Sequence, residues 1–508
     1  MGVESNGVEP RSADPAIISG GMGVWISWWV LARIVSIMGG LGVVSGTALE
    51  IVHARVLQQG DPGGHIRRAF AELARLQPSL APALTRLLQK FYIEGGKAKK
   101  ASYKGVPMWK LRRIPEASED RLSFMEPGED LQVLTVAANF AEVWLAKEGH
   151  SGKVGINYLR KIERPIPWNL YGAMLADVDY VVMGAGSPSE LPGMIDKLSQ
   201  AEPASLPLRV YGSDSKAAGY SVMVRPKKLL GEDAPRLNKP KFLAIVSSFG
   251  LAKLLAGDPG TRPYGFIIEG PEAGGHNAPP GKKSFDKDRK PTVVYTQEDR
   301  ADVGAIAGLG LPFWLAGSYG SAEGLRRAKS MGAAGIQVGT VAALSQQSGM
   351  RPDLRAQVLK LVAEEKIDVV AEALTSPSGF PFKVAQLPGT LAAPGVYESR
   401  KRLCDIGQLQ TGYIDPEGNL DFRCPAEPLS EFARKGGKEQ NTVGRVCLCN
   451  GLMATAGFAQ TRPDGYQEPP IVTLGDDFTL VRELMSLLAP GQESYSIGKA
   501  LGHIRKAA

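Results

Sequence analysis

Segment 265–277 brings together the residue types that catalysis needs. An apolar run, Phe266-Ile267-Ile268, leads into an acidic, glycine-rich turn that ends at His276. Glycines let a backbone approach a ligand closely, because no Cβ stands in the way. Histidine is the side chain that most readily moves a proton near neutral pH. The segment therefore predicts an active-site loop at the end of a buried strand, with His276 as its proton-transfer group.

Comparable turns follow other apolar runs along the chain. They are Gly20-Gly21-Met22-Gly23, Ala316-Gly317-Ser318 and Val338-Gly339-Thr340, and Asn157 closes a further run. Backbone N–H groups in such turns can bind phosphate, and the Thr340 hydroxyl adds a donor. Each glycine alone has a structural alternative, since glycine also serves helix packing and left-handed turns. Together, in this order, the turns favour a phosphorylated cofactor as the ligand.

Eight short apolar runs alternate with helix-like stretches, and they are expected to be strands. They cover residues 16–20, 41–45, 154–158, 180–186, 242–247, 264–270, 313–317 and 335–340. Most are β-branched and end in Gly, Ser or Asn, which is typical of parallel strands buried on both faces. The pattern predicts an α/β fold, a (β/α)8 TIM barrel with its chemistry at the carboxyl ends of the strands. Residues 131–137 are a further candidate strand, and a doubly wound sheet is the alternative fold.

The barrel does not account for the whole chain. Residues 1–13 are polar and expected to be disordered, and the barrel takes 14–57 and 129–375. Residues 58–128 read as a basic, helical insertion after the second strand, where it would lie over the catalytic face as a lid. Residues 376–508 form a C-terminal extension.

The four cysteines of the chain all fall in this extension: Cys404, Cys424, Cys447 and Cys449. Their clustering allows a zinc or iron–sulfur site. The spacing lacks the paired C-x-x-C of common metal sites, so free or buried thiols are the favoured interpretation and no metal is assigned.

Composition narrows the classes of partner. The 508 residues carry a net charge of +7, with lysines and arginines dispersed along the chain. No nucleic-acid-binding motif accompanies this charge, so nucleic acid is not an expected partner. The apolar stretch 16–44 contains Arg33 and many glycines, which argues against a membrane span. No signal-peptide pattern opens the chain, and we expect a cytoplasmic protein.

The motifs taken together resemble the nitronate monooxygenase (2-nitropropane dioxygenase) family, which includes the FMN-dependent enoyl-acyl-carrier-protein reductases. The resemblance covers about residues 14–350 and implies a TIM barrel that holds non-covalent FMN. It rests on Gly-Gly-Met near the start, Gly39-Gly40-Leu41-Gly42, Glu272-Ala273-Gly274-Gly275-His276, Leu315-Ala316-Gly317-Ser318-Tyr319-Gly320 and Gly335-Ile336-Gln337-Val338-Gly339-Thr340. The region with Arg423-Cys424-Pro425 and Cys447-Leu448-Cys449-Asn450 looks like that of long bacterial members.

The resemblance implies a role for each matching residue. His276 matches the catalytic histidine of the family. Gly21 and Met22 would lie against the flavin ring, and Asn157 would contact the ring or the ribityl chain. The other implied FMN-binding residues are Gly274, Gly275, Ala316, Gly317, Ser318, Gly339 and Thr340. Glu269, which ends an apolar strand, would hydrogen-bond FMN or fix the loop, and a purely structural role is its alternative.

The resemblance implies an FMN-dependent oxidoreductase that oxidises a nitronate or nitroalkane with O2, with His276 taking the α-proton. The alternative is an NAD(P)H-dependent enoyl-thioester reductase in which His276 orients or protonates the substrate. Asn277 follows the histidine where nitronate enzymes often have Arg-Gly. The basic insertion would suit an acidic acyl carrier protein, and a homodimer is a further expectation. A flavin-free phosphate-binding barrel is the more distant alternative.

Overall fold

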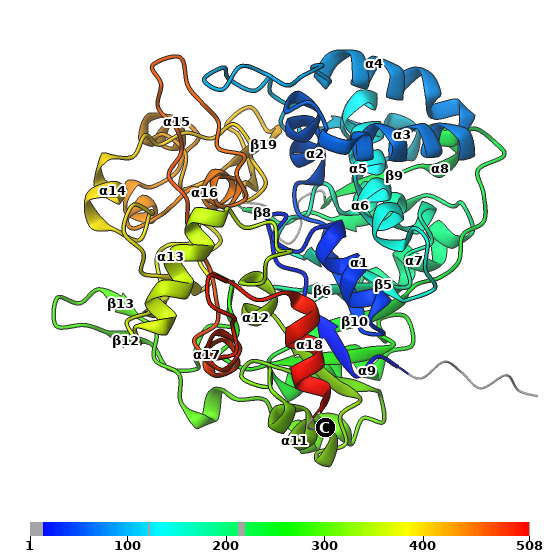
Figure 1. Cartoon of the computed structure of the whole chain (residues 1–508). Helices are drawn as coiled ribbons and strands as arrows, with labels where there is room; N and C mark the ends of the chain where they lie inside the picture. The colour runs from blue at the N-terminus through cyan, green and yellow to red at the C-terminus, as the bar shows by residue number, and fades with distance from the viewer. Residues whose placement is uncertain (1–13, 120–121, 212–218, 507–508) are drawn as a thin grey trace, which may run out of the picture.

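Eight parallel strands close into a barrel in the computed structural model, which describes residues 14–119, 122–211 and 219–506 (Figure 1). The strands are β1 (Ile17–Ser19), β2 (Leu41–Ser45), β5 (Val154–Leu159), β6 (Tyr180–Gly184), β10 (Lys241–Val246), β11 (Gly265–Glu269), β14 (Phe313–Ala316) and β15 (Gly335–Val338). They follow one another around the barrel in chain order, and β15 pairs with β1 to close it. The predicted (β/α)8 barrel is confirmed, whereas the expected disorder of 1–13 lies outside the described residues.

Each of the eight predicted strands overlaps one strand of the barrel, because a strand buried on both faces needs the continuous apolar, β-branched runs that the sequence shows. The candidate strand at 131–137 is wrong, since these residues lie inside the helix α5 (Glu129–Lys147). Helix α5 packs against α1, α2, α3 and α6 and is buried on almost every side. It therefore lacks the single apolar stripe that marks a surface helix.

Helices that follow the strands surround the barrel. They include α1 (Trp29–Ile37), α2 (Leu49–Gln58), α5, α6 (Ile166–Leu175), α7 (Leu191–Ser199), α9 (Phe249–Gly257), α10 (Val303–Ala307), α11 (Ala322–Ser330) and α12 (Thr340–Ala343). Two features lie between β6 and β10: the short helix α8 (Pro226–Leu230), and strands β7 (Ala204–Pro207), β8 (Val210–Tyr211) and β9 (Gly219–Val224). Between β11 and β14, the pair β12 (Ser284–Phe285) and β13 (Pro291–Thr292) forms a small hairpin that projects from the body in Figure 1.

The insertion 58–128 contains the expected helices, α3 (His65–Leu76) and α4 (Ala81–Phe91). Both pack against α5, and α3 buries Ile66, Phe70 and Leu73. Its strands β3 (Arg112–Arg113) and β4 (Leu122–Glu126) join β9 and β7 in one sheet. The insertion thus packs on the outer helices of the barrel (Figure 1), and none of its described residues lines the main cavity described below.

The C-terminal extension contains five α-helices and three strands among the described residues. Helix α13 (Pro352–Ala363) and strand β16 (Val369–Glu372) precede it, and its helices are α14 (Pro394–Ser399), α15 (Leu429–Arg434), α16 (Leu448–Thr455), α17 (Thr479–Ser486) and α18 (Ile497–Lys506). Its strands are β17 (Phe382–Ala385), which pairs with β16, and β18 (Thr411–Ile414) and β19 (Leu420–Arg423). Helix α18 packs against α1, α11 and α12, so the end of the chain returns to the barrel (Figure 1). No helix of the described residues is long and apolar enough to cross a membrane.

Candidate active site

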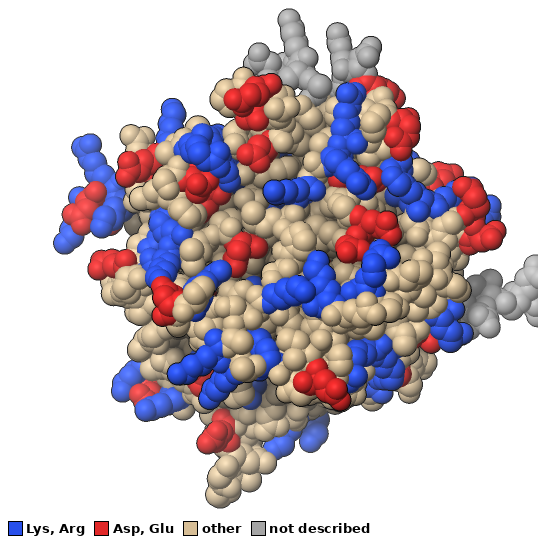
Figure 2. Space-filling model, turned by 90° about the horizontal axis from the view of Figure 1, so that it is seen from above, with Lys and Arg blue, Asp and Glu red and all other residues tan. Residues whose placement is uncertain are grey.

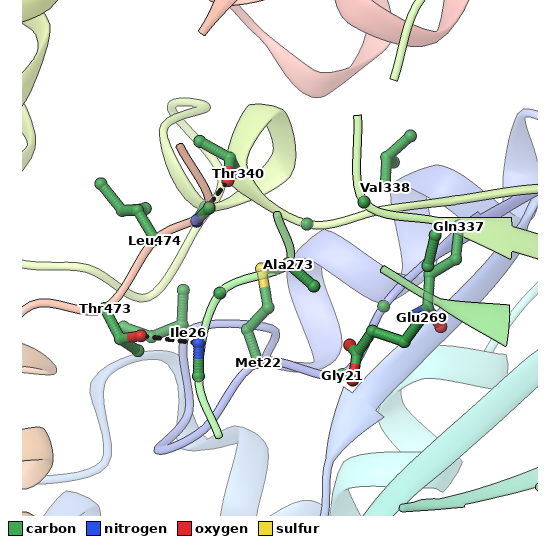
Figure 3. Close-up of a pocket in the computed structure, with 18 of the residues that line it drawn as sticks. Gly21, Met22, Ile26, Glu269, Ala273, Gln337, Val338, Thr340, Thr473 and Leu474 are labelled. Atoms are coloured by element: carbon green, nitrogen blue, oxygen red, sulfur yellow. Dashed lines mark hydrogen bonds between the residues drawn. The ribbon is translucent and has the colours of Figure 1, made fainter. Parts of the chain in front are cut away.

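A cavity of about 710 Å³ opens at the carboxyl ends of the barrel strands, and it gathers the residues that the sequence analysis singled out. Its lining includes Gly21, Met22, Asn157, Glu269, Gly274, Gly275, His276, Ala316, Gly317, Ser318, Gly339 and Thr340. Figure 3 shows Met22, Glu269, Ala273 and Thr340 around this space. These residues lie close together because the parallel strands of the closed barrel have their carboxyl ends at one face. The roles of these residues toward a cofactor stay predictions.

The backbone approaches its neighbours closely at the end of β1. A Cβ on Gly21 would stand 2.2 Å from the Cβ of Asn157, so only glycine fits there. Asn157 is buried and lines the cavity, yet its Oδ1 has no hydrogen-bond partner in the described structure. A buried amide oxygen without a partner costs free energy, which a ligand donor would recover. Asn157 is therefore a ready acceptor for a bound molecule.

The turns after β14 and β15 form a cradle of free donors. Within the described residues, the N–H groups of Ser318, Gly339 and Thr340 have no hydrogen-bond acceptor. Gly317 has φ at +83°, a left-handed conformation that favours glycine, and Ser318 follows it at +59°. Successive N–H groups in such turns make a concave anion site. The cradle has the chemistry to bind a phosphate.

His276 is held by the C-terminal extension. Its Nε2 lies 2.6 Å from the Oγ of Ser376 and 3.3 Å from the Oγ of Ser378, and its ring packs edge-on against Phe382. Burial lowers the pKa of His276 well below its usual value, and the nearby Lys161 ammonium lowers it further. The imidazole is thus neutral at neutral pH, able to accept a proton or to offer a neutral N–H group.

Two further charged side chains lie near His276. They are Glu269 at the end of β11 and Lys161 in the loop between β5 and α6. Burial raises the pKa of Glu269 to about 7, and the Lys161 ammonium opposes that rise. Burial lowers the pKa of Lys161 to about 7, helped by Arg209. The Lys161 Nζ has no hydrogen-bond partner in the described structure and lies 3.6 Å from the centroid of the Phe380 ring. Both groups change charge near neutral pH, as acid–base groups of active sites do.

Glu269→Gln is expected to stabilise the protein at alkaline pH. Because the folded pKa of Glu269 is raised, the native state holds the proton more tightly than the unfolded chain, and this stability is lost as pH rises toward 7. The glutamine side chain does not titrate, so the variant does not lose this stability. Its free energy of unfolding is therefore higher than that of the unchanged protein by on the order of 2 kcal/mol at pH 8, and by less at pH 5. Denaturant unfolding of both proteins at pH 5 and pH 8 measures this difference.

The matched control for this prediction is Glu272→Gln, on the same loop. Glu272 pairs with Arg300, which is half-exposed at the surface. Such an exposed pair contributes about 0–1 kcal/mol, so we expect little change at either pH. Equal stabilisation by Glu269→Gln at pH 5 and pH 8 would contradict the account of the buried carboxyl.

The C-terminal extension supplies a wall of the cavity that the sequence analysis did not predict. The lining residues from this part are Phe382, Ile406, Gln408, Leu409, Leu448, Cys449, Leu452, Thr473, Leu474, Gly475, Asp477, Thr479, Leu480, Val481, Glu483 and His503. No described residue of the insertion 58–128 lines the cavity. The cover expected from the insertion therefore comes from the other end of the chain. Ser376 and Ser378 were also missed, because an ordinary Ser-Pro-Ser turn carries no signal of its role.

The four cysteines are free thiols that surround a second, much smaller cavity of about 10 Å³. Burial raises the pKa of Cys404 to about 12 and that of Cys424 well above its usual value. Hydrogen bonding to Cys449, together with burial, raises the pKa of Cys447 as well. No three or more His, Cys, Asp or Glu side chains of the described residues are placed to hold a metal ion.

Among known proteins, the chain is similar to several solved structures. A scan of protein-family models and a search of curated proteins find no match. FabK from Thermotoga maritima is similar at 15% identity and a TM-score of 0.46, over 97% of this chain and 93% of that one. A nitroalkane oxidase from Streptomyces ansochromogenes is similar at 12% identity and a TM-score of 0.44, over 97% and 95%.

A third similar structure is the enoyl reductase domain of MlnA from the macrolactin biosynthesis cluster of Bacillus amyloliquefaciens. It has 12% identity and a TM-score of 0.37, over 75% of this chain and 66% of that one. At such identities and TM-scores, the fold of this chain is established by its own strand order.

Proposed function

We propose that the protein is an FMN-dependent oxidoreductase. The observation that carries the proposal is the single cavity that joins a cradle of free N–H groups to His276 and Glu269 at the carboxyl face of the barrel. When bound, FMN supplies transfer of a hydride or of single electrons, which these side chains cannot do themselves. The site suits a phosphorylated, partly apolar ligand with hydrogen-bond donors, and FMN has each of these features.

Different residues of the chain would bind different parts of FMN. Ser318, Gly339 and Thr340 would bind the phosphate through their N–H groups. Asn157 would accept a hydrogen bond through its unpartnered Oδ1. Gly21 lies at the end of β1 in close approach to Asn157, and both line the cavity where the flavin ring would lie. The burial of Glu269 strengthens its electrostatic effect on a bound substrate.

An α,β-unsaturated thioester is the substrate that the cavity supports best. The wall contributed by the extension is mostly apolar, with Ile406, Leu409, Leu448 and Leu452 among its residues. A small nitroalkane has little apolar surface to bury there, whereas an acyl chain has much. His276 would orient the thioester, and the protonated fraction of Glu269 near neutral pH offers a proton to the α-carbon. The activity would then be NAD(P)H-dependent reduction of an enoyl thioester.

Nitronate oxidation is the second candidate, and the neutral state of His276 supports it. A neutral imidazole can take the α-proton of a nitroalkane, whereas an imidazolium cannot. Burial keeps His276 in this state across the neutral range. Electrons would come from the nitronate and pass to O2. Assays of NADPH oxidation with crotonyl thioester, and of O2 uptake with a nitronate, distinguish the two activities in the same preparation.

Narrowing the apolar wall is expected to select against long substrates. Leu452 of α16 lines the cavity, and Leu452→Trp fills part of it. We expect kcat/KM for a long-chain enoyl thioester to fall about tenfold or more, and that for a four-carbon one to change less than about threefold. Leu487→Trp, at an exposed site, is the control. An equal loss for both chain lengths would contradict the assignment of this wall to the acyl chain.

The partners and location of the protein belong to the proposal as well. An enoyl-thioester reductase would receive its substrate on coenzyme A or on an acidic acyl carrier protein. On the face shown in Figure 2, basic and acidic side chains are interspersed. We propose a small-molecule or carrier-bound substrate, a cytoplasmic location and a homodimer as the working expectations, each open to direct measurement.

A further inference from the structure

Residues 473–476, which we call the strap, run along one side of the cavity beside the His276 loop and Thr340 (Figure 3). The Gly275 N–H donates to the Thr473 Oγ1 at 2.8 Å, and the Gly475 N–H donates to the Thr340 Oγ1 at 2.9 Å. Two groups that are expected to surround the phosphate are thus already bonded to the strap. The strap therefore stands against the phosphate cradle itself.

The strap and the His276 loop touch through their backbones. A Cβ on Gly274 would lie 2.7 Å from the carbonyl carbon of Leu474, and a Cβ on Gly475 would lie 2.7 Å from the Glu272 carbonyl oxygen. The Asp476 N–H donates to that same oxygen at 3.3 Å. Since not even a methyl group fits between them, no ligand passes through this contact while the strap is in place.

Both ends of the strap are anchored to β17. The buried Lys383 forms an ion pair with Asp476, and its backbone N–H donates to the Gly275 carbonyl at 2.9 Å. The Ala385 N–H donates to the carbonyl of Val472 at 2.9 Å. Asp476 is 44% exposed, so water can compete for its half of the ion pair. Lifting the strap breaks a few polar bonds at this exposed end and also moves the buried Leu474, a local opening that leaves the barrel strands paired.

We propose that the strap is a gate for the phosphorylated cofactor: it lifts from Thr340 and Gly275 to admit the phosphate end of FMN and closes again behind it. The inference rests on the proposed FMN site and adds the route by which that site is filled. Because the same bonds must break for uptake and for release, weakening them speeds both steps. The affinity for FMN changes little, since the strap is closed in the same way in the free protein and in the FMN complex.

The test combines stopped-flow FMN binding with hydrogen exchange of the Gly475 and Asp476 amides. The variants are Thr473→Val, which removes a hydroxyl at nearly constant volume, and Asp476→Asn, which removes the charge partner of Lys383. Each is expected to speed FMN association and dissociation roughly five- to tenfold and to change Kd less than about threefold. Asp464→Asn removes an exposed ion pair with Lys401 elsewhere in the extension and is the matched control.

The outcomes separate the gate from the proposed function. Faster amide exchange with unchanged FMN rates overturns the gate, because FMN then enters by another route. A rise in dissociation alone also overturns it, since the strap would then be a clamp that binds FMN directly. If the unchanged protein binds no FMN at all, the proposed function fails together with the gate.

Discussion

Replacing His276 by Ala is expected to lower turnover about 100- to 10,000-fold, because the imidazole would orient the thioester in enoyl reduction or take the α-proton in nitroalkane oxidation. FMN should stay bound, because the cradle of Ser318, Gly339 and Thr340 does not depend on the imidazole. The loss should fall on kcat for whichever substrate the protein uses. The measurement is steady-state kinetics on enzyme whose flavin content is determined by absorbance.

Ser376→Ala is the companion variant, since Ser376 positions His276 through the 2.6 Å contact to Nε2. We expect a smaller loss, roughly three- to tenfold, because Ser378 remains within 3.3 Å of the same nitrogen. Turnover unchanged by His276→Ala would remove the histidine from the mechanism. A loss in Ser376→Ala as large as that in His276→Ala would instead make the serine a reacting group.

Gly339→Asp is expected to abolish tight FMN binding while leaving riboflavin binding almost unchanged. The backbone of Gly339 has φ at −122°, and a Cβ there would meet no atom within 4 Å, so a side chain fits. A carboxylate beside the phosphate costs about 3 kcal/mol at the dielectric of a partly exposed site, which is roughly a 100-fold loss of affinity. Riboflavin has no phosphate and feels no such repulsion.

Gly339→Ala controls for the added side chain without the charge. We expect it to bind FMN and riboflavin within about threefold of the unchanged protein, because the space around Gly339 is open. Equilibrium titrations of flavin fluorescence measure all four affinities. Equal losses of FMN and riboflavin in Gly339→Asp would mean that the phosphate lies elsewhere.

The barrel could be predicted from the sequence because its strands are buried on both faces. Runs such as Phe266-Ile267-Ile268 are apolar throughout, and most end at a glycine, serine or asparagine that marks the carboxyl edge. The predicted site residues meet in one cavity for the same reason, since the fold brings strand ends together. Helix α5 was misread in part because nearly complete burial hides the helical period.

The contributions of the extension could not be predicted, because they depend on contacts between distant parts of the chain. Ser376 lies 100 residues from His276 in sequence, and Thr473 lies 198 residues from Gly275. Neither segment contains a pattern that relates it to the barrel. Lys161 follows the predicted end of its strand by only three residues, but its burial beside Glu269 arises from the loop conformation.

The visible spectrum of the purified protein, recorded anaerobically before and after NADPH is added, tests the central claim most directly. The account predicts a yellow protein, or one that becomes yellow with FMN, whose flavin absorbance is bleached by NADPH. A flavin that bleaches only with a nitronate would keep the oxidoreductase and change its electron donor. A colourless protein that takes up no FMN would contradict the account.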